Sequence, residues 1–176
     1  MRTDDFAPTL ETLFSELVNG APASAYMLNS GDVGLLQSLD RLSAEAASVP
    51  TSTGASIAAH VDHLRYGLAL MNRWSAGEHP FEDADWSQSW KRRVVSDEEW
   101  QRLREQLRGE AARWLDALRV PREVTGTELN GMIGSIAHLA YHLGAIRQID
   151  PTLRGPAEGS QVSASPEPRA RGSREP

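Results

Sequence analysis

The sequence predicts an all-α protein: a four-helix bundle with a short extra N-terminal helix and a long crossover between the second and third bundle helices. Apolar residues recur three and four positions apart in five segments, which is the spacing of one helix face. No stretch alternates apolar and polar residues between turn signals, so strands are not expected. The chain has 176 residues, of which 40 % are hydrophobic and 24 % charged, and this is enough to bury the core of one such domain.

The first three helices are predicted from apolar periodicity and from turn residues between the periodic segments. The short N-terminal helix covers about residues 6–18 and ends at an Asn-Gly pair. The first bundle helix covers about 35–46, and Pro50 lies just beyond it. The second bundle helix opens in the Ser- and Thr-rich stretch before Ile57, which offers N-caps, and extends to about Gly77.

The last two helices have stronger start and stop signals. Ser96 and Glu99 have the spacing of a capping box, in which each side chain bonds the other residue's backbone amide, so a helix is expected to follow as far as residue 118. The final helix is expected over about 127–149 and stops before Pro151.

The connection over residues 77–96 is long for a helical bundle. A link of this length can cross the end of the bundle, so the helices that it joins need not be antiparallel neighbours. It carries Trp86 and Trp90, which we expect to cover one end of the bundle as a lid or a plug.

The bundle domain is predicted to occupy residues 1–150. Residues 151–176 consist mainly of Pro, Gly, Ser, Glu and Arg, and this composition cannot bury enough apolar surface to offset the entropy of ordering. We therefore expect a disordered tail over residues 151–176.

Charge and cysteine content exclude several classes of function. The 18 basic and 24 acidic residues give a net charge of -6, which does not favour binding to nucleic acid or to an anionic membrane. No apolar run approaches the roughly 20 residues of a membrane span, and the N-terminus is acidic, so a cytoplasmic protein is expected. The sequence has no cysteine, so any metal ion must be bound by histidines and carboxylates.

The most informative polar residues are two histidines of the last predicted helix. His138 and His142 are four positions apart, so both imidazoles lie on one helical face and can bind one metal ion together. Small residues share this face, which leaves room for a ligand: Gly131, Gly134, Ser135 and Ala145. The helix has few charges and is expected to be largely buried, and a buried histidine pair needs a partner such as a metal ion.

A third ligand is available from the second bundle helix, which carries His60 and His63. His60 lies about 60° from the centre of the apolar stripe and His63 about 120° from it, at 100° per residue. Periodicity therefore slightly favours His60 as the inward-facing group and leaves both histidines as candidates.

Two segments resemble the DinB superfamily of small four-helix-bundle metalloenzymes, also called DinB/YfiT-like: SIAAHVDHLRYGLALMNRW and SIAHLAYHLGAIRQI. The resemblance covers most of residues 30–150. One metal ligand of that family follows the pattern [TS]-[IV]-x-x-x-x-x-H-[LIV], which begins here at Ser56 and places the ligand at His63. The other two come from an HxxxH motif, which corresponds to His138 and His142.

The resemblance selects His63 over His60, which we keep as an outer group that contacts a ligand or as an alternative ligand. The Arg-Gly-Gln run that usually follows the last histidine of the family is replaced here by Leu-Gly-Ala-Ile-Arg-Gln over residues 143–148. No function is therefore assigned to that arginine and glutamine.

The resemblance implies a divalent metal ion, zinc or nickel, bound by three histidines with open positions, which is typical of a catalytic site. It implies a small-molecule substrate, and for part of the family a low-molecular-weight thiol, so a thiol-dependent S-transferase and a hydrolase are both expected possibilities. The alternative is a helical bundle that binds a metal or ligand without catalysis. A homodimer is also expected, because such bundles are commonly dimeric and Leu70, Trp74 and Ile149 lie off the core stripe.

Overall fold

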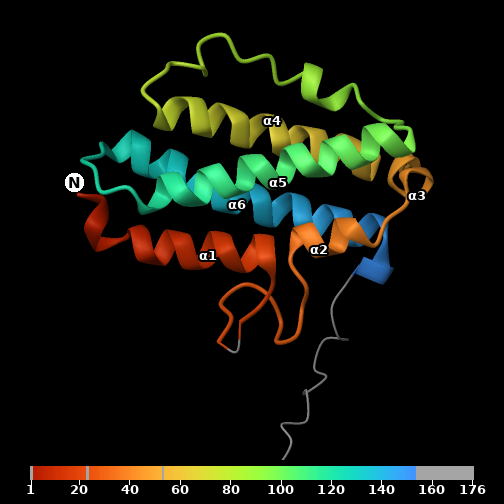
Figure 1. Cartoon of the computed structure of the whole chain (residues 1–176), viewed down its shortest axis with the longest axis horizontal. Helices are drawn as coiled ribbons and strands as arrows, with labels where there is room; N and C mark the ends of the chain where they lie inside the picture. Colours follow the sequence, from red (N-terminus) through yellow and green to blue (C-terminus); the bar gives the residue numbers. More distant parts are fainter. Residues whose placement is uncertain (1, 23, 53, 154–176) are drawn as a thin grey trace, which may run out of the picture.

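The computed structural model describes residues 2–22, 24–52 and 54–153, which form four long and two short α-helices. These residues contain no strand beyond two isolated β-bridges, so the predicted all-α bundle is confirmed (Figure 1). The helices are α1 (Ala7–Asn19), α2 (Leu35–Asp40), α3 (Ala44–Ser48), α4 (Ile57–Ser75), α5 (Asp97–Arg119) and α6 (Gly126–Ile149). Three short 3-10 helices complete the described chain: η1 (Thr3–Asp5), η2 (Gln88–Trp90) and η3 (Pro151–Leu153).

The four long helices form the bundle, with α4 and α1 each in contact with both α5 and α6. Helices α4 and α5 run parallel to each other, and α1 and α6 run in the opposite direction (Figure 1). The parallel direction is visible in the contact of Asn72, near the end of α4, with the Glu110 carboxylate in the second half of α5. Because α4 and α5 are parallel, the chain must return along the whole length of α4 before α5 begins.

The core lies between these helices and contains two large aromatic side chains of α5. Trp100 and Trp114 are almost fully buried. The indole N–H of Trp100 donates to the carbonyl of Leu42 at 2.9 Å, and that of Trp114 donates to the hydroxyl of Ser135 at 3.0 Å. Both polar atoms are thus satisfied, so the rings contribute apolar burial without an unpaired N–H.

The helices before α4 differ from the predicted ones. Helix α1 is a full member of the bundle rather than a short extra helix, because Phe14 and Leu17 are buried in the core. The helix predicted over 35–46 is two short helices, α2 and α3. It breaks because Ser43 caps α3, its hydroxyl accepting a hydrogen bond from the Ala46 amide at 3.1 Å.

The crossover segment, residues 76–96, runs back along the outside of α4 (Figure 1), whereas the sequence suggested a path across the end of the bundle. Hydrogen bonds fix it to α4 and to the N-cap residue Ser56, and three of them lie outside the histidine cluster. The Ser56 hydroxyl donates to the carbonyl of Arg93 at 2.6 Å, and the Tyr66 hydroxyl accepts from the Asp85 amide at 3.0 Å. The third joins the side chains of Arg92 and Asp62 at 3.1 Å. The crossover segment therefore covers a side of α4 that would otherwise face solvent.

The packed chain extends three residues past the predicted domain boundary at 150. Leu153 of η3 is buried and belongs to the core cluster. The rest of the predicted tail, residues 154–176, lies outside the described residues. Across the helices of the described chain, none combines the length and the hydropathy that a transmembrane span needs.

Candidate metal centre

Helices α4 and α6 bring four histidines together inside the bundle. The helices are antiparallel, so His60 and His63, one turn apart on α4, face His142 and His138 on α6. The Nε2 atom of His138 lies 3.0 Å from Nε2 of His63 and 3.0 Å from Nε2 of His142. Three ring nitrogens from two helices therefore point at one small volume.

The tautomer of His63 follows from its contact with Ser89 of η2. The Ser89 hydroxyl has one hydrogen, which it donates to the carbonyl of Trp86 at 2.7 Å. The contact of 2.7 Å between His63 Nδ1 and Ser89 Oγ therefore requires Nδ1–H to be the donor. Neutral His63 thus carries its proton on Nδ1 and directs the lone pair of Nε2 toward the other two histidines.

His142 is oriented in a similar way by His60. The Nδ1 atoms of these two rings are 2.8 Å apart, so one of them donates to the other. When His142 binds a metal ion through Nε2, its proton is on Nδ1, and His60 is the acceptor. His60 therefore lies behind the His142 ring, on the side away from the three converging nitrogens.

Burial favours the neutral form of these four histidines. His60, His63 and His142 are 8 %, 7 % and 2 % exposed, and His138 is half-buried. Burial and then the neighbouring histidines lower the pKa of His63 to about 4 and that of His142 to about 3. Burial also lowers the pKa of His60 and of His138. Imidazole binds metal ions in its neutral form, so the site is prepared for a metal at neutral pH.

The three nitrogens fit a divalent transition metal. One ring nitrogen from each of His63, His138 and His142 lies within 4.8 Å of the others, and within the described chain no carboxylate joins this group. Metal–nitrogen bonds of about 2.0–2.1 Å place neighbouring ligand atoms of a tetrahedral site about 3.3 Å apart. The two separations of 3.0 Å are close to this value, so a small adjustment of the rings would admit an ion.

Two tryptophans of the crossover segment cover the histidines. Trp90 stacks on His63, with ring centroids 4.4 Å apart and an angle of 26° between the planes. Trp86 packs at an angle against His63, at 5.4 Å, and edge-on to His138, at 6.3 Å. These rings were expected over an end of the bundle, but they lie over the side of α4, where they shield the histidines from water.

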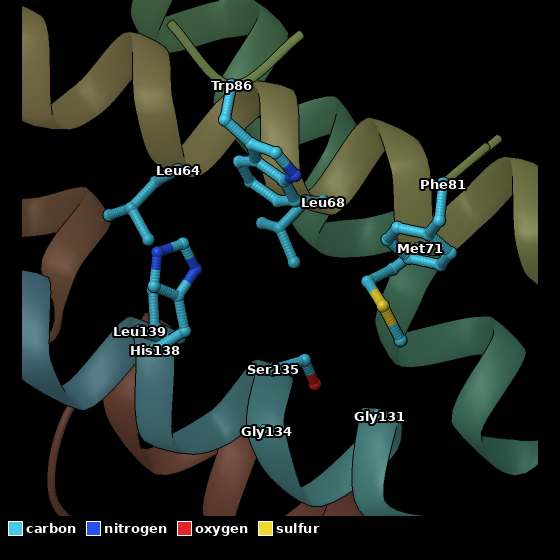
Figure 2. A pocket seen from close by; sticks show the side chains of 11 residues that line it. Leu64, Leu68, Met71, Phe81, Trp86, Gly131, Gly134, Ser135, His138 and Leu139 are labelled. Atoms are coloured by element: carbon cyan, nitrogen blue, oxygen red, sulfur yellow. The ribbon is translucent and has the colours of Figure 1, made fainter. Parts of the chain in front are cut away.

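A cavity of about 260 Å³ lies beside His138, between α4 and α6 (Figure 2). Figure 2 shows Leu64 and Leu68 of α4 and Trp86 of the crossover segment on one side, and Ser135 of α6 on the other. The cavity is lined by three of the small residues that were expected from the sequence to leave room for a ligand: Gly131, Gly134 and Ser135. The full lining is Leu64, Gly67, Leu68, Met71, Phe81, Trp86, Gly131, Gly134, Ser135, His138 and Leu139.

The structure thus brings together the three histidines that the sequence and the resemblance selected, and it places His60 in contact with one of them. Ser89 was missed, because it lies in an irregular segment 26 residues from His63 and no sequence pattern links the two. Asp62 faces two arginines, Arg65 at 2.8 Å and Arg92 at 3.1 Å, and does not join the histidine group.

Arg147, whose role the sequence left open, binds elsewhere. Its guanidinium donates to the Asp32 carboxylate and to the Val33 carbonyl, both at 2.8 Å, and so ties the loop before α2 to the end of α6. A search of protein-family models, of curated proteins and of solved structures found no match to this chain. The function is therefore inferred from the geometry of the histidine site.

Proposed function

We propose that this chain is a metal-dependent enzyme of the DinB type in which His63, His138 and His142 bind one zinc or nickel ion. The observation that carries the proposal is the convergence of three imidazole nitrogens, from the buried His63 and His142 and the half-buried His138, with no fourth protein ligand in the described chain. Structural zinc sites are usually closed by four protein ligands, whereas catalytic sites leave a position for water or substrate.

The position of His60 supports the catalytic alternative over a non-catalytic, closed site. A closed site would need His60 as a fourth ligand, but its Nδ1 contacts Nδ1 of His142 and lies on the far side of that ring. His60 is thereby placed to hold a ligand in orientation, as hydrogen-bond partners of metal-binding histidines usually do.

The chain's own residues supply orientation and shielding. Ser89 holds His63, His60 holds His142, and the rings of Trp86 and Trp90 limit the access of water. A bound divalent ion would supply Lewis acidity that lowers the pKa of a water or thiol nucleophile. No carboxylate is grouped with the three histidines in the described chain, so the proposal assigns no side chain as general base.

Two reaction types agree with this arrangement, a hydrolase that activates water and an S-transferase that activates a low-molecular-weight thiol. The test is to load the full chain with Zn²⁺ or Ni²⁺ and to assay activated esters and amides, then pairs of a small thiol and an alkyl halide. Turnover of an ester without thiol supports the hydrolase, and turnover that requires thiol supports the transferase. No turnover in either screen supports the non-catalytic alternative.

The metal site itself is tested by elemental analysis of untagged protein. We expect one metal ion per chain, and loss of binding in His63→Ala, His138→Ala and His142→Ala. His79→Ala is the control, because His79 is the one histidine outside the cluster and its side chain is exposed. Full occupancy in the His138→Ala protein would contradict the proposed site.

We also propose a cytoplasmic homodimer, whose contact surface differs from the one expected from the sequence. Leu70 is buried within the chain, and Trp74 and Ile149 pack against the core, so these residues do not form the expected exposed patch. Ile133 and Tyr141 of α6 are instead exposed. Light scattering should give the dimer mass at micromolar concentration, and a monomer mass there would contradict the proposal.

A further inference from the structure

None of the side chains that line the cavity beside His138 is charged. The only hydroxyl is that of Ser135, which donates to the carbonyl of Met132 at 2.7 Å and accepts from the indole of Trp114 at 3.0 Å. A charged group in this cavity would lose its hydration and find no partner, whereas an apolar group would gain by burial.

His138 is the one residue shared by the cavity and the histidine cluster. Its Nε2 points at His63 and His142, while its Nδ1 and Cε1 edge faces Gly67 on the cavity wall, since a Cβ added to Gly67 would lie 3.6 Å and 3.5 Å from these atoms. Of the three converging histidines, His63 and His142 have protein partners for Nδ1. In the described chain His138 Nδ1 has none.

We infer that this cavity is the substrate pocket, that it takes an uncharged, mainly apolar group, and that Nδ1–H of His138 donates a hydrogen bond to it from the cavity wall. The inference rests on the proposed metal site, which binds the reactive end of the same molecule. Histidines that bind metal ions nearly always donate the other ring N–H to an acceptor, and here the acceptor comes from the substrate.

The size of the cavity limits the group that it accepts. A cavity of about 150 Å³ with an apolar lining holds a benzene ring. The volume of about 260 Å³ therefore accommodates an aromatic ring with a short substituent, or an aliphatic group of similar size. Phe81, Trp86 and Met71 offer the ring faces and the thioether that such a group would contact.

The test uses two metal-binding compounds that differ only in the apolar group. The full chain is loaded with Co²⁺, and its visible spectrum is followed while acetohydroxamate or 2-phenylacetohydroxamate is added. We expect the phenyl compound to bind roughly 10-fold more tightly or better, because the ring is buried. A phenyl compound with a para-carboxylate should lose this advantage.

Two matched glycine variants test whether the preference for the phenyl compound arises in the cavity. Gly131 lines it, and a Cβ there would lie 4.0 Å from Cε of Met71, so Gly131→Leu should fill the space. Gly144 lies on the same helix but not in the lining, and a Cβ there would have no neighbour within 4 Å. Leu is a better helix former than Gly, so both variants should fold. Gly131→Leu should abolish the preference for the phenyl compound and leave the affinities for Co²⁺ and acetohydroxamate unchanged, while Gly144→Leu should change none of them.

The outcomes separate this inference from the proposed function. Equal affinities of the two compounds in the wild-type protein would overturn the pocket and leave the metal site intact. An equal loss of preference in both glycine variants would place the apolar contact elsewhere and would also overturn it. If Co²⁺ does not bind, or if it binds with equal affinity to the wild type and to His138→Ala, the proposed metal site is contradicted. The inference about the pocket, which rests on that site, is then contradicted too.

Discussion

Helix α5 and the first half of α4 bury their residues in different ways. In α5 the buried side chains recur three and four positions apart, and most of the positions between them are exposed or half-buried: Trp100, Leu103, Leu107, Ala111, Trp114 and Leu118. In α4 every residue from Ile57 to Leu64 is buried, including two histidines and an aspartate. The first pattern is that of a helix with one face toward solvent, and the second is that of a helix covered on all sides.

The cover on α4 explains why polar residues are found there. Buried polar groups destabilise a protein unless they have partners, and each one here has a partner outside α4. His60 contacts His142, His63 contacts Ser89 and His138, and Asp62 binds Arg92. Helix α5 therefore contributes chiefly to stability, whereas the buried side chains in the first half of α4 build the histidine site.

The largest effect is expected on the free energy of unfolding, for a substitution in the core face of α5. Leu107 is fully buried, so Leu107→Ala should lower the free energy of unfolding by about 2–5 kcal/mol, through lost burial and the cavity that remains. Urea unfolding of the metal-free protein measures this. Gln106→Ala, one position away and exposed, is the control and should change it by less than about 0.5 kcal/mol.

Similar effects of the two substitutions would mean that α5 is not packed on a single face. Metal affinity provides a second measurement, because Leu107 lies outside the histidine cluster. The Leu107→Ala protein, where folded, should bind metal as the wild type does.

The sequence predicted the scaffold well wherever local signals and tertiary packing agree. The capping box of Ser96 and Glu99 is present at the start of α5. A second box at the start of α6, Thr125 with Glu128, was missed although it has the same spacing. The break between α2 and α3 was missed too, because apolar spacing continues through it while Ser43 caps the new helix.

The site was harder to predict because its geometry depends on contacts between distant segments. Periodicity placed His63 to the side of the apolar stripe of its helix. Its position on α4 is indeed there, when the helix is considered without the segments that cover it. The crossover segment turns that flank into an interior, with Trp90 stacked on the ring and Ser89 bonded to it. Only the resemblance, and not the spacing, favoured His63 over His60.

The second prediction concerns the contact between His60 and His142. His60→Ala removes the partner of His142 Nδ1 and should weaken metal binding roughly 10-fold to 100-fold, which is about 1.4–2.8 kcal/mol. The reason is that His142 then loses the bond that holds its ring and its tautomer. Competition with a chromophoric chelator measures the affinity.

A conservative variant separates positioning from packing. His60→Gln retains a side-chain acceptor and should recover part of the affinity that His60→Ala loses. Complete loss of metal in His60→Ala would show that His60, and not His63, is the third ligand.

The third prediction is the pH dependence of stability in the metal-free protein, which is kept metal-free with a chelator. The pKa of His63 is about 4 in the folded chain, against an ordinary value of 6.5, so the unfolded chain binds more protons between these values. The stabilisation from keeping His63 neutral is therefore complete above about pH 6.5 and is lost as the pH falls toward 4. Its slope is at most about 1.4 kcal/mol per pH unit for one histidine.

Urea unfolding of the wild type and of His63→Gln at pH 7.5, 6, 5 and 4.5 measures this contribution, because only the wild type has this proton to gain. The difference in stability between the two proteins should shrink steadily as the pH falls below 6.5. His79→Gln is the control, since His79 is exposed in the crossover segment and lies outside the histidine cluster. A constant difference down to pH 4.5 would mean that His63 titrates as it does in the unfolded chain, and the region of α4 around it would then be as open to water as the outer face of α5.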